Sequence, residues 1–426
     1  MTGMCWGGEN PATDGFRVLA RVEVSGSLSD IGLPVYADFL DSQGNYYALT
    51  IAAREQLQSA GVSFRVIDDY LPGNRYLIGR ERRPGARSRV EREARVLYDD
   101  GLRIIVRSEP GIADGLSEMG FALKLISETP VVLVPAAREP PARAPMAFGF
   151  TPDPLVSRMI GAVSQDTVLS YISGLSGTNP VAVGGTSYTI STRSTASGQP
   201  LQKATQYVFE QLQATGLTAS FENWTYGSYA QRNVVGELTG VALPAEVVLL
   251  TAHLDDMPAS GAASGADDNA SGCAALLAAA DIMSRYRFER TIRFVFFTGE
   301  EQGLLGSARY AEAAAAAGDA IVAVLNLDMI AYSLAAPLQR LHTRVPGNPG
   351  YAADHALADA FVDVINGYRM TGDLQALITA DGEWASDHSS FWDRGFAAIL
   401  VIEDDYDDFN PYYHSAADQM PHLNPA

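Results

Sequence analysis

The sequence predicts an α/β fold, in which a mostly parallel mixed sheet flanked by helices follows a small α+β repeat domain. Three observations lead to this prediction. The chain has 426 residues, which is too long for one average hydrophobic core. Three segments before residue 135 resemble one another, and beyond residue 155 apolar strands alternate with amphipathic helices. We therefore expect two domains.

The three similar segments predict a domain of strand-helix-strand repeats over residues 1–135. They read FRVLARVEVSGSLSDIGLPVYA, YYALTIAAREQLQSAGVSFRVID and LRIIVRSEPGIADGLSEMGFALKLIS. Each contains a β-branched run, a short polar stretch that ends in glycine, and then alternating apolar residues. The glycines, Gly32, Gly61 and Gly120, are typical of a left-handed helix stop. No catalytic motif occurs in the repeats, so we expect a propeptide-like segment or a lid.

A stretch rich in proline and alanine predicts a linker over residues 136–154, AAREPPARAPMAFGFTPDP. The second domain then spans residues 155–426. Its apolar strands include AEVVLLTAH, TIRFVFFTG, AIVAVLNLDMI and FAAILVIE, and helical patterns lie between them. Strands that are apolar throughout are typical of a sheet covered on both faces. In such sheets ligands bind beyond the carboxyl ends of the strands.

The charge of the chain excludes two classes of partner. A formal net charge of -20 argues against binding to nucleic acid or to an anionic membrane, because both require basic surface. No apolar stretch reaches the roughly 20 residues that span a bilayer, so we expect no membrane insertion. The first residues, MTGMCWGGENPATDG, contain no signal-peptide pattern.

Charged residues gather where the strands of the second domain end. His253 ends one strand, Glu300 and Glu301 follow the next, and Asp328 follows a third. The last strand continues to His414, and the loop GADDNASG adds Asp267 and Asp268 before a helix. So many carboxylates at one sheet edge repel one another unless cations neutralise them. Nitrogen and oxygen ligands without thiolates favour zinc, with manganese or cobalt as alternatives.

These residues stand in a familiar order. The set AHLDD, GADDNASG, TGEEQGLLGS, NLDM and YYHSAAD resembles the M28 family of di-zinc aminopeptidases, which includes bacterial leucyl-type enzymes. The resemblance covers residues 151–426 and implies the fold of that family, a zinc-peptidase sandwich of helices around a mixed sheet. It also implies two zinc ions as cofactors.

The resemblance implies five metal ligands. One zinc would be bound by His253 and Asp328, the other by Glu301 and His414, and Asp268 would bridge the two ions. Asp267 is then left as a neighbour. These assignments rest on matching the motifs position by position.

The resemblance also implies catalytic and supporting residues. Glu300 matches the general base of the family, and Tyr413 is a candidate for stabilising the oxyanion. Asp255 matches the acid that orients the first histidine ligand. We expect Asp387, in the stretch SDH, and Asp418 to support the centre without binding metal.

The implied function is a metallo-aminopeptidase that hydrolyses the N-terminal bond of peptides or proteins. A metal-bridging hydroxide and a glutamate base would act on substrates with large apolar first residues. The first alternative is a glutaminyl cyclase, which uses one zinc on the same scaffold. The second is a non-catalytic peptide-binding module. The resemblance further implies a secreted or periplasmic protein.

Several aromatic residues and histidines lie outside the motifs. Four aromatic residues are candidates either for an apolar substrate pocket or for the core: Trp384, Phe391, Trp392 and Tyr412. We expect the remaining histidines, His342, His355 and His422, to be ordinary surface or packing residues.

Overall fold

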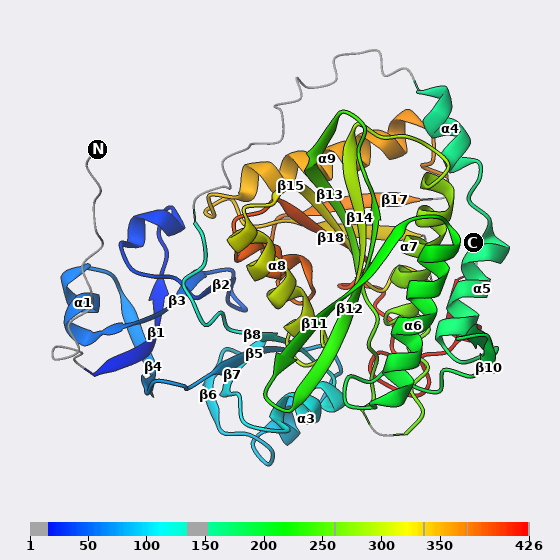
Figure 1. Ribbon diagram of the computed structural model, residues 1–426. Coiled ribbons are helices and arrows are strands. Elements are labelled where there is room, and N and C mark those ends of the chain that lie inside the picture. The colour runs from blue at the N-terminus through cyan, green and yellow to red at the C-terminus, as the bar shows by residue number, and fades with distance from the viewer. Residues whose placement is uncertain (1–15, 134–151, 260, 335–336, 373, 425–426) are drawn as a thin grey trace.

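A computed structural model describes residues 16–133, 152–259, 261–334, 337–372 and 374–424. The predicted linker over residues 136–154 therefore lies almost wholly outside the described residues, and helix α4 begins at its end. Two small sheets precede residue 134, and a large sheet with its helices follows residue 152 (Figure 1). None of the described helices is long and apolar enough to cross a membrane.

The first small sheet is antiparallel, with strand order β2-β3-β1-β4. Its strands are β1 (Arg17–Glu23), β2 (Ala37–Leu40), β3 (Tyr46–Ala53) and β4 (Phe64–Tyr70). The short helices η1 (Leu28–Ile31) and α1 (Arg54–Ser59) join them. The apolar alternation of β1 turns its Val and Ala side chains into one core with Leu28 and Leu57 of these helices.

The second small sheet is also antiparallel, with order β6-β7-β5-β8. It consists of β5 (Tyr76–Glu81), β6 (Val96–Asp99), β7 (Arg103–Arg107) and β8 (Phe121–Leu125), with helices α2 (Arg87–Val90) and α3 (Ile112–Met119). The unit β5-α2-β6 was not recognised in the sequence. Gly120 ends α3 with φ 99°, as a left-handed helix stop requires, and Gly32 and Gly61 also have positive φ.

The large sheet has eight strands in the order β11-β12-β14-β13-β15-β18-β16-β17. Parallel pairing joins β14, β13, β15 and β18 at its centre, and also β16 with β17, whereas β11, β12 and the β16-β18 pair are antiparallel. The strands are β11 (Thr218–Tyr226), β12 (Tyr229–Leu238), β13 (Leu243–His253), β14 (Arg290–Phe297), β15 (Ala320–Leu327), β16 (Leu338–His342), β17 (Gln375–Thr379) and β18 (Ala398–Glu403). The predicted mixed sheet is confirmed.

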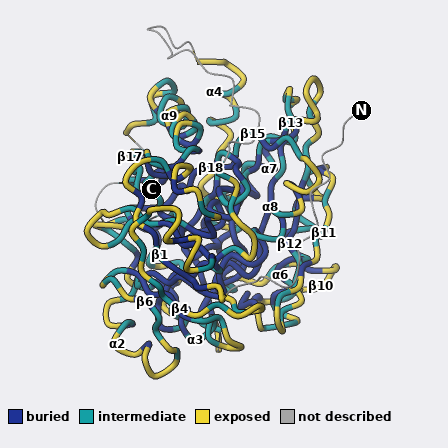
Figure 2. The backbone as a smooth tube through the Cα atoms, turned by 90° about the vertical axis from the view of Figure 1, so that its left-hand side faces the viewer, coloured by how far each residue is buried: buried dark blue, intermediate teal, exposed yellow. Residues whose placement is uncertain are grey.

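Helices cover both faces of this sheet, as the apolar strands require. Residues alternate along β14, so that Phe294 and Phe296 face helices α5, α6 and α7, whereas Val295 and Phe297 face α8 and α10. The buried strands run through the middle of the molecule in Figure 2. The elements not yet given are α4 (Pro154–Ile160), α5 (Gln165–Leu175), β9 (Val181–Val183), β10 (Thr186–Tyr188), α6 (Gln199–Ala214), α7 (Ala270–Met283), α8 (Leu305–Ala317), α9 (Tyr351–Gly367), α10 (His388–Trp392) and η2 (Met420–His422).

The four aromatic candidates for a substrate pocket are packed into the protein. Phe391 and Trp392 belong to the core between the sheet and α8. Trp384 packs with residues of the two small sheets. The ring of Tyr412 stacks on that of His422 at 3.8 Å between centroids. The burial of Phe391, Trp392 and Trp384 favours the core interpretation for these three residues, whereas Tyr412 is only partly buried.

Candidate metal centre

The carboxyl ends of the central strands bring the charged residues to one place. β13 ends at His253, and the segments that follow β14, β15 and β18 supply Glu301, Asp328 and His414. Asp268 comes from the loop before α7. All five predicted ligands are buried, with between 1% and 6% of each residue exposed. Parallel strands end at the same sheet edge, which is why residues far apart in sequence meet here.

Three groups of side chains among the described residues could each hold a metal ion, and Asp268 belongs to two of them. The first group contains His253, Asp268 and Asp328, and the second contains Asp268, Glu301 and His414. One oxygen of Asp268, Oδ1, lies 3.2 Å from His253 Nε2, which is itself 3.2 Å from Asp328 Oδ1. The other oxygen, Oδ2, lies 3.5 Å from His414 Nε2. Asp268 thus stands between the two groups.

The second group contains acceptor atoms that face one another. His414 Nδ1 lies 2.6 Å from a backbone carbonyl oxygen and must donate to it, which leaves Nε2 of a neutral ring as an acceptor. That Nε2 lies only 2.6 Å from Glu301 Oε2. Within the described residues, Asp268 Oδ2, Glu301 Oε1 and His414 Nε2 are buried and make no hydrogen bond. Such an arrangement fits a cation, and the donor set suits zinc.

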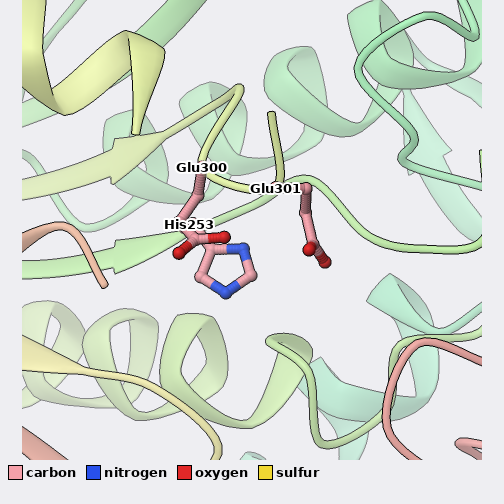
Figure 3. Close-up of side chains that lie close together, drawn as sticks. All are labelled: His253, Glu300 and Glu301. Carbon is pink, nitrogen blue, oxygen red and sulfur yellow. The ribbon is translucent and has the colours of Figure 1, made fainter. Parts of the chain in front are cut away.

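Glu300 lies beside the first group. Figure 3 shows its carboxylate against the imidazole of His253, while the side chain of Glu301 leaves the backbone in another direction. Ligand atoms of these three residues lie within 4.8 Å of one another. Burial raises the pKa of Glu300 well above its usual range, opposed by His253 and reinforced by Glu301. A carboxyl with a raised pKa can accept and return a proton near neutral pH.

Hydrogen bonds from neighbouring residues hold the predicted ligands. The backbone carbonyl of Asp255 lies 3.1 Å from His253 Nδ1, closer than the Asp255 carboxylate at 3.8 Å. The carboxylate instead accepts from the backbone N–H groups of Glu300 and Glu301, each at 3.3 Å. Asp418 accepts from the backbone N–H of Asp268 at 2.9 Å. These contacts fix the orientation of the ligands before any ion binds.

The other predicted residues have distinct surroundings. Asp267 is turned away from the two groups, and its carboxylate accepts from the Ala331 N–H at 2.9 Å. The ring of Tyr413 stacks on His414 at 3.7 Å between centroids. Asp387 is buried near Glu300, and burial raises its pKa to about 7. Ser386, its chain neighbour, donates to Asp328 Oδ2 at 2.6 Å and was not singled out in the sequence.

The amino-terminal region reaches the centre through residues that the sequence did not single out. The carbonyl oxygen near His414 Nδ1 belongs to Ser117 of α3, and the Ser117 hydroxyl lies 3.3 Å from Glu301 Oε2. Arg83 donates to the carbonyl of His414 at 3.4 Å. The backbone N–H of Leu125 in β8 donates to Gly303, just after Glu301, at 3.1 Å. The second small sheet and α3 therefore cover the centre.

His342, one of the histidines outside the motifs, is fully buried near this cover. It lies between Asp381 and Asp405, with Nδ1 at 2.9 Å and Nε2 at 3.1 Å from their oxygens. Burial lowers the pKa of His342, but the two carboxylates outweigh it and raise the pKa to about 9. His342 is therefore charged at neutral pH. The sequence around His342 is an ordinary strand pattern and did not predict these buried contacts with two carboxylates.

Comparisons with known proteins agree with the arrangement. The family model described as peptidase family M28 matches residues 233–426. A probable aminopeptidase of Saccharomyces cerevisiae is 29% identical, over 49% of this chain and 56% of that protein. Leucine aminopeptidase 1 of Arthroderma otae is 29% identical, over 52% of this chain and 62% of that protein. The chain thus spans less than two thirds of these relatives.

Solved structures share the fold. The LapA aminopeptidase of Legionella pneumophila superposes with a TM-score of 0.61 at 18% identity, over 83% of this chain and 94% of that chain. A zinc aminopeptidase of Bacillus subtilis superposes with a TM-score of 0.51 at 15% identity, over 62% and 91%. The Legionella structure matches 83% of this chain, so the match includes part of the amino-terminal region as well as the large sheet.

Proposed function

We propose that this protein is a metallo-aminopeptidase that removes N-terminal residues from peptides or proteins, on the premise that residues 233–426 match the model of peptidase family M28. The observation that carries the proposal is the position of Asp268, with one carboxylate oxygen toward His253 and the other toward His414. A carboxylate shared by two histidine-containing groups fits a pair of ions better than a single one.

We assign the metal ligands as the geometry and the family resemblance suggest. His253 and Asp328 would hold one zinc, Glu301 and His414 the other, and Asp268 both. When bound, such ions lower the pKa of water toward neutrality and polarise the peptide carbonyl. Manganese or cobalt would suit the same nitrogen and oxygen donors.

Glu300 would act as the general base. It would take one proton from the attacking water as the new carbon–oxygen bond forms, and give that proton to the amine nitrogen as the carbon–nitrogen bond breaks. Its raised pKa, due first to burial, suits both transfers. Tyr413, stacked on His414, is the proposed donor to the carbonyl oxygen of the substrate. Asp255, Asp387 and Asp418 would hold these residues in place.

We propose that the first residue of the substrate has a large side chain, which would reach a wall of apolar residues. Met329, Leu400 and Ile402 form a cluster with Tyr413, and Phe409 packs against it. Met329 follows the predicted ligand Asp328, and Tyr413 precedes His414. The wall therefore adjoins the proposed centre.

A panel of aminoacyl-nitroanilides, assayed with zinc and with a chelator, tests the proposed function. We expect release of nitroaniline that the chelator abolishes and added zinc restores. Metal content and pyroglutamate formation from N-terminal glutamine are measured on the same preparation. One ion per chain with pyroglutamate as product would identify a cyclase instead, and bound metal with no product would indicate a peptide-binding protein.

We also propose that the amino-terminal region acts as a lid. The predicted ligands are at most 6% exposed, and Ser117 contacts two of them, so a peptide reaches the centre only when this region moves. Lys124 of β8 helps to hold it closed, because its Nζ lies 2.8 Å from Asp393 Oδ1 and both side chains are mostly buried.

Lys124→Ala is expected to raise kcat/KM on a nitroanilide by roughly tenfold, because breaking a buried ion pair weakens only the closed form. The measurement is steady-state hydrolysis by the zinc-loaded full chain. Arg285→Ala, which removes an exposed ion pair to Asp281 of α7, is the matched control and should leave the rate unchanged. An unchanged or lower rate for Lys124→Ala would count against the lid.

A further inference from the structure

Arg82 of the amino-terminal region is buried between two acidic side chains near the proposed centre. Its side chain is only 5% exposed, and its Nη1 lies 2.9 Å from Asp405 Oδ2. Its Nη2 lies 3.7 Å from Glu383 Oε2. The side chains of both acids are fully buried. We call this the Asp405–Glu383 pocket.

An aromatic wall connects the pocket to the centre. The guanidinium carbon of Arg82 lies 5.4 Å from the centroid of the Phe409 ring. Phe409 lies 5.1 Å from Tyr413, which in turn stacks on His414 at 3.7 Å, all between ring centroids. Two aromatic residues, Phe409 and Tyr413, therefore separate a side chain in this pocket from the proposed metal ligand His414.

The walls and the occupant of the pocket come from different parts of the chain. Asp405, Glu383 and Phe409 belong to the same region as the metal centre, whereas Arg82 follows β5 in the proposed lid. Glu383 has two ion partners in the described part of the chain, Arg82 and Arg80, and both belong to the lid. When the lid moves, Glu383 loses both of them.

A buried carboxylate without a partner is costly, so the open pocket requires another cation. Asp405 still lies 3.1 Å from His342 Nε2, and the positive charge of His342 partly balances that of the Asp405 carboxylate. Glu383 keeps only the backbone N–H of Ala385, at 3.1 Å. Two carboxylates beside an aromatic ring match the planar, multiply donating guanidinium better than any apolar group.

We propose that the Asp405–Glu383 pocket binds the cationic side chain of the substrate residue at the scissile bond, arginine in preference to lysine, and that Arg82 fills it while the lid is closed. This inference rests on the proposed aminopeptidase function and replaces the purely apolar first residue expected from the sequence. The aliphatic stem of arginine would lie along the wall of Met329, Leu400 and Ile402, and its head would reach the acids.

Substrate choice gives the first test. The zinc-loaded full chain should hydrolyse the arginine nitroanilide with kcat/KM at least about tenfold above that for leucine. Glu383→Gln and Asp405→Asn should each lower the ratio of kcat/KM for arginine to kcat/KM for leucine by about tenfold or more, because a weakened lid changes both rates by the same factor. Two variants are used because Asp405 also supports His342. A preference for leucine, or equal losses on both substrates, would overturn the proposal.

Binding gives a second test that does not depend on turnover. Arg82→Ala removes one of the contacts that close the lid, so every ligand should bind this variant more tightly than the parent chain, measured by titration calorimetry. In this variant L-argininamide should bind at least about tenfold more tightly than L-leucinamide and L-citrullinamide, which lack the charge. Arg82→Lys keeps a cation in place and should gain little. Arg107→Ala, which removes an arginine paired to Asp68 in the same region, is the matched control.

The two tests separate the two proposals. If no nitroanilide is hydrolysed, the proposed function fails, and the calorimetric comparison still decides the pocket. If nitroanilides are hydrolysed but Arg82→Ala binds argininamide no better than leucinamide, the pocket proposal fails and the aminopeptidase stands.

Discussion

Glu300→Gln is expected to lower kcat by about a hundredfold to ten-thousandfold, the usual contribution of a general base, while bound metal stays unchanged. Glutamine has nearly the same shape but cannot accept a proton from water. Glu300 lies against His253 but is not one of the five proposed ligands, so its loss as a base should not release an ion. Turnover on the best nitroanilide and metal content by atomic absorption are measured on one preparation.

Glu312→Gln provides the control for this substitution. Glu312 lies on α8 and pairs with Arg309 in a partly exposed position, so kcat should not change. Activity retained by Glu300→Gln would remove the role assigned to Glu300. Activity lost together with the metal would instead make Glu300 a ligand, an arrangement that its group with His253 and Glu301 would also permit.

Asp268→Ala is expected to release both ions and abolish turnover, because this one carboxylate contributes to both proposed sites. Metal binding to the folded form stabilises it by an amount that grows with the logarithm of the free metal concentration, so the melting temperature of the parent chain should fall when a chelator is added. The melting temperature of Asp268→Ala should no longer respond to the chelator. Metal content and the two melting curves are the measurements.

Asp281→Ala is the matched control for Asp268→Ala, since Asp281 is a partly exposed aspartate of the neighbouring helix α7. It should retain metal and the response to chelator. If Asp268→Ala kept both ions, Asp268 would not bridge them. If it kept one, the two groups would be independent sites rather than one centre.

The sequence predicted the large sheet and its charged edge because both depend on local patterns. Apolar runs such as those of β13 and β14 are read directly as buried strands. Parallel pairing then brings the residues after each strand to one edge, so His253 and Glu301 meet without any further information. His253, Glu301 and Asp328 lie together for this reason, whereas Asp268 and His414 come from loops and were assigned from the family resemblance.

Contacts between regions that are far apart in the sequence could not be predicted from local patterns. Ser117 lies in a repeat that resembles two others, yet only its copy contacts His414. Arg82 and Asp405 are separated by most of the chain, and neither stands in a recognisable motif. Phe391 and Trp392 follow the stretch SDH in the sequence. Their side chains nevertheless lie in the core, because α10 places them against α8. Tertiary packing, rather than local sequence, decides these cases.

The contact of Ser117 with the centre has a consequence for every affinity measured on the full chain if the amino-terminal region is the lid that we propose. A peptide would then bind only those molecules in which this region has moved away, and its apparent dissociation constant would be the intrinsic one divided by that fraction. If about one molecule in a hundred is open, every ligand will bind about a hundredfold more weakly than its contacts allow. The ranking of ligands by affinity is preserved. Their absolute dissociation constants also include the free energy of closing the lid.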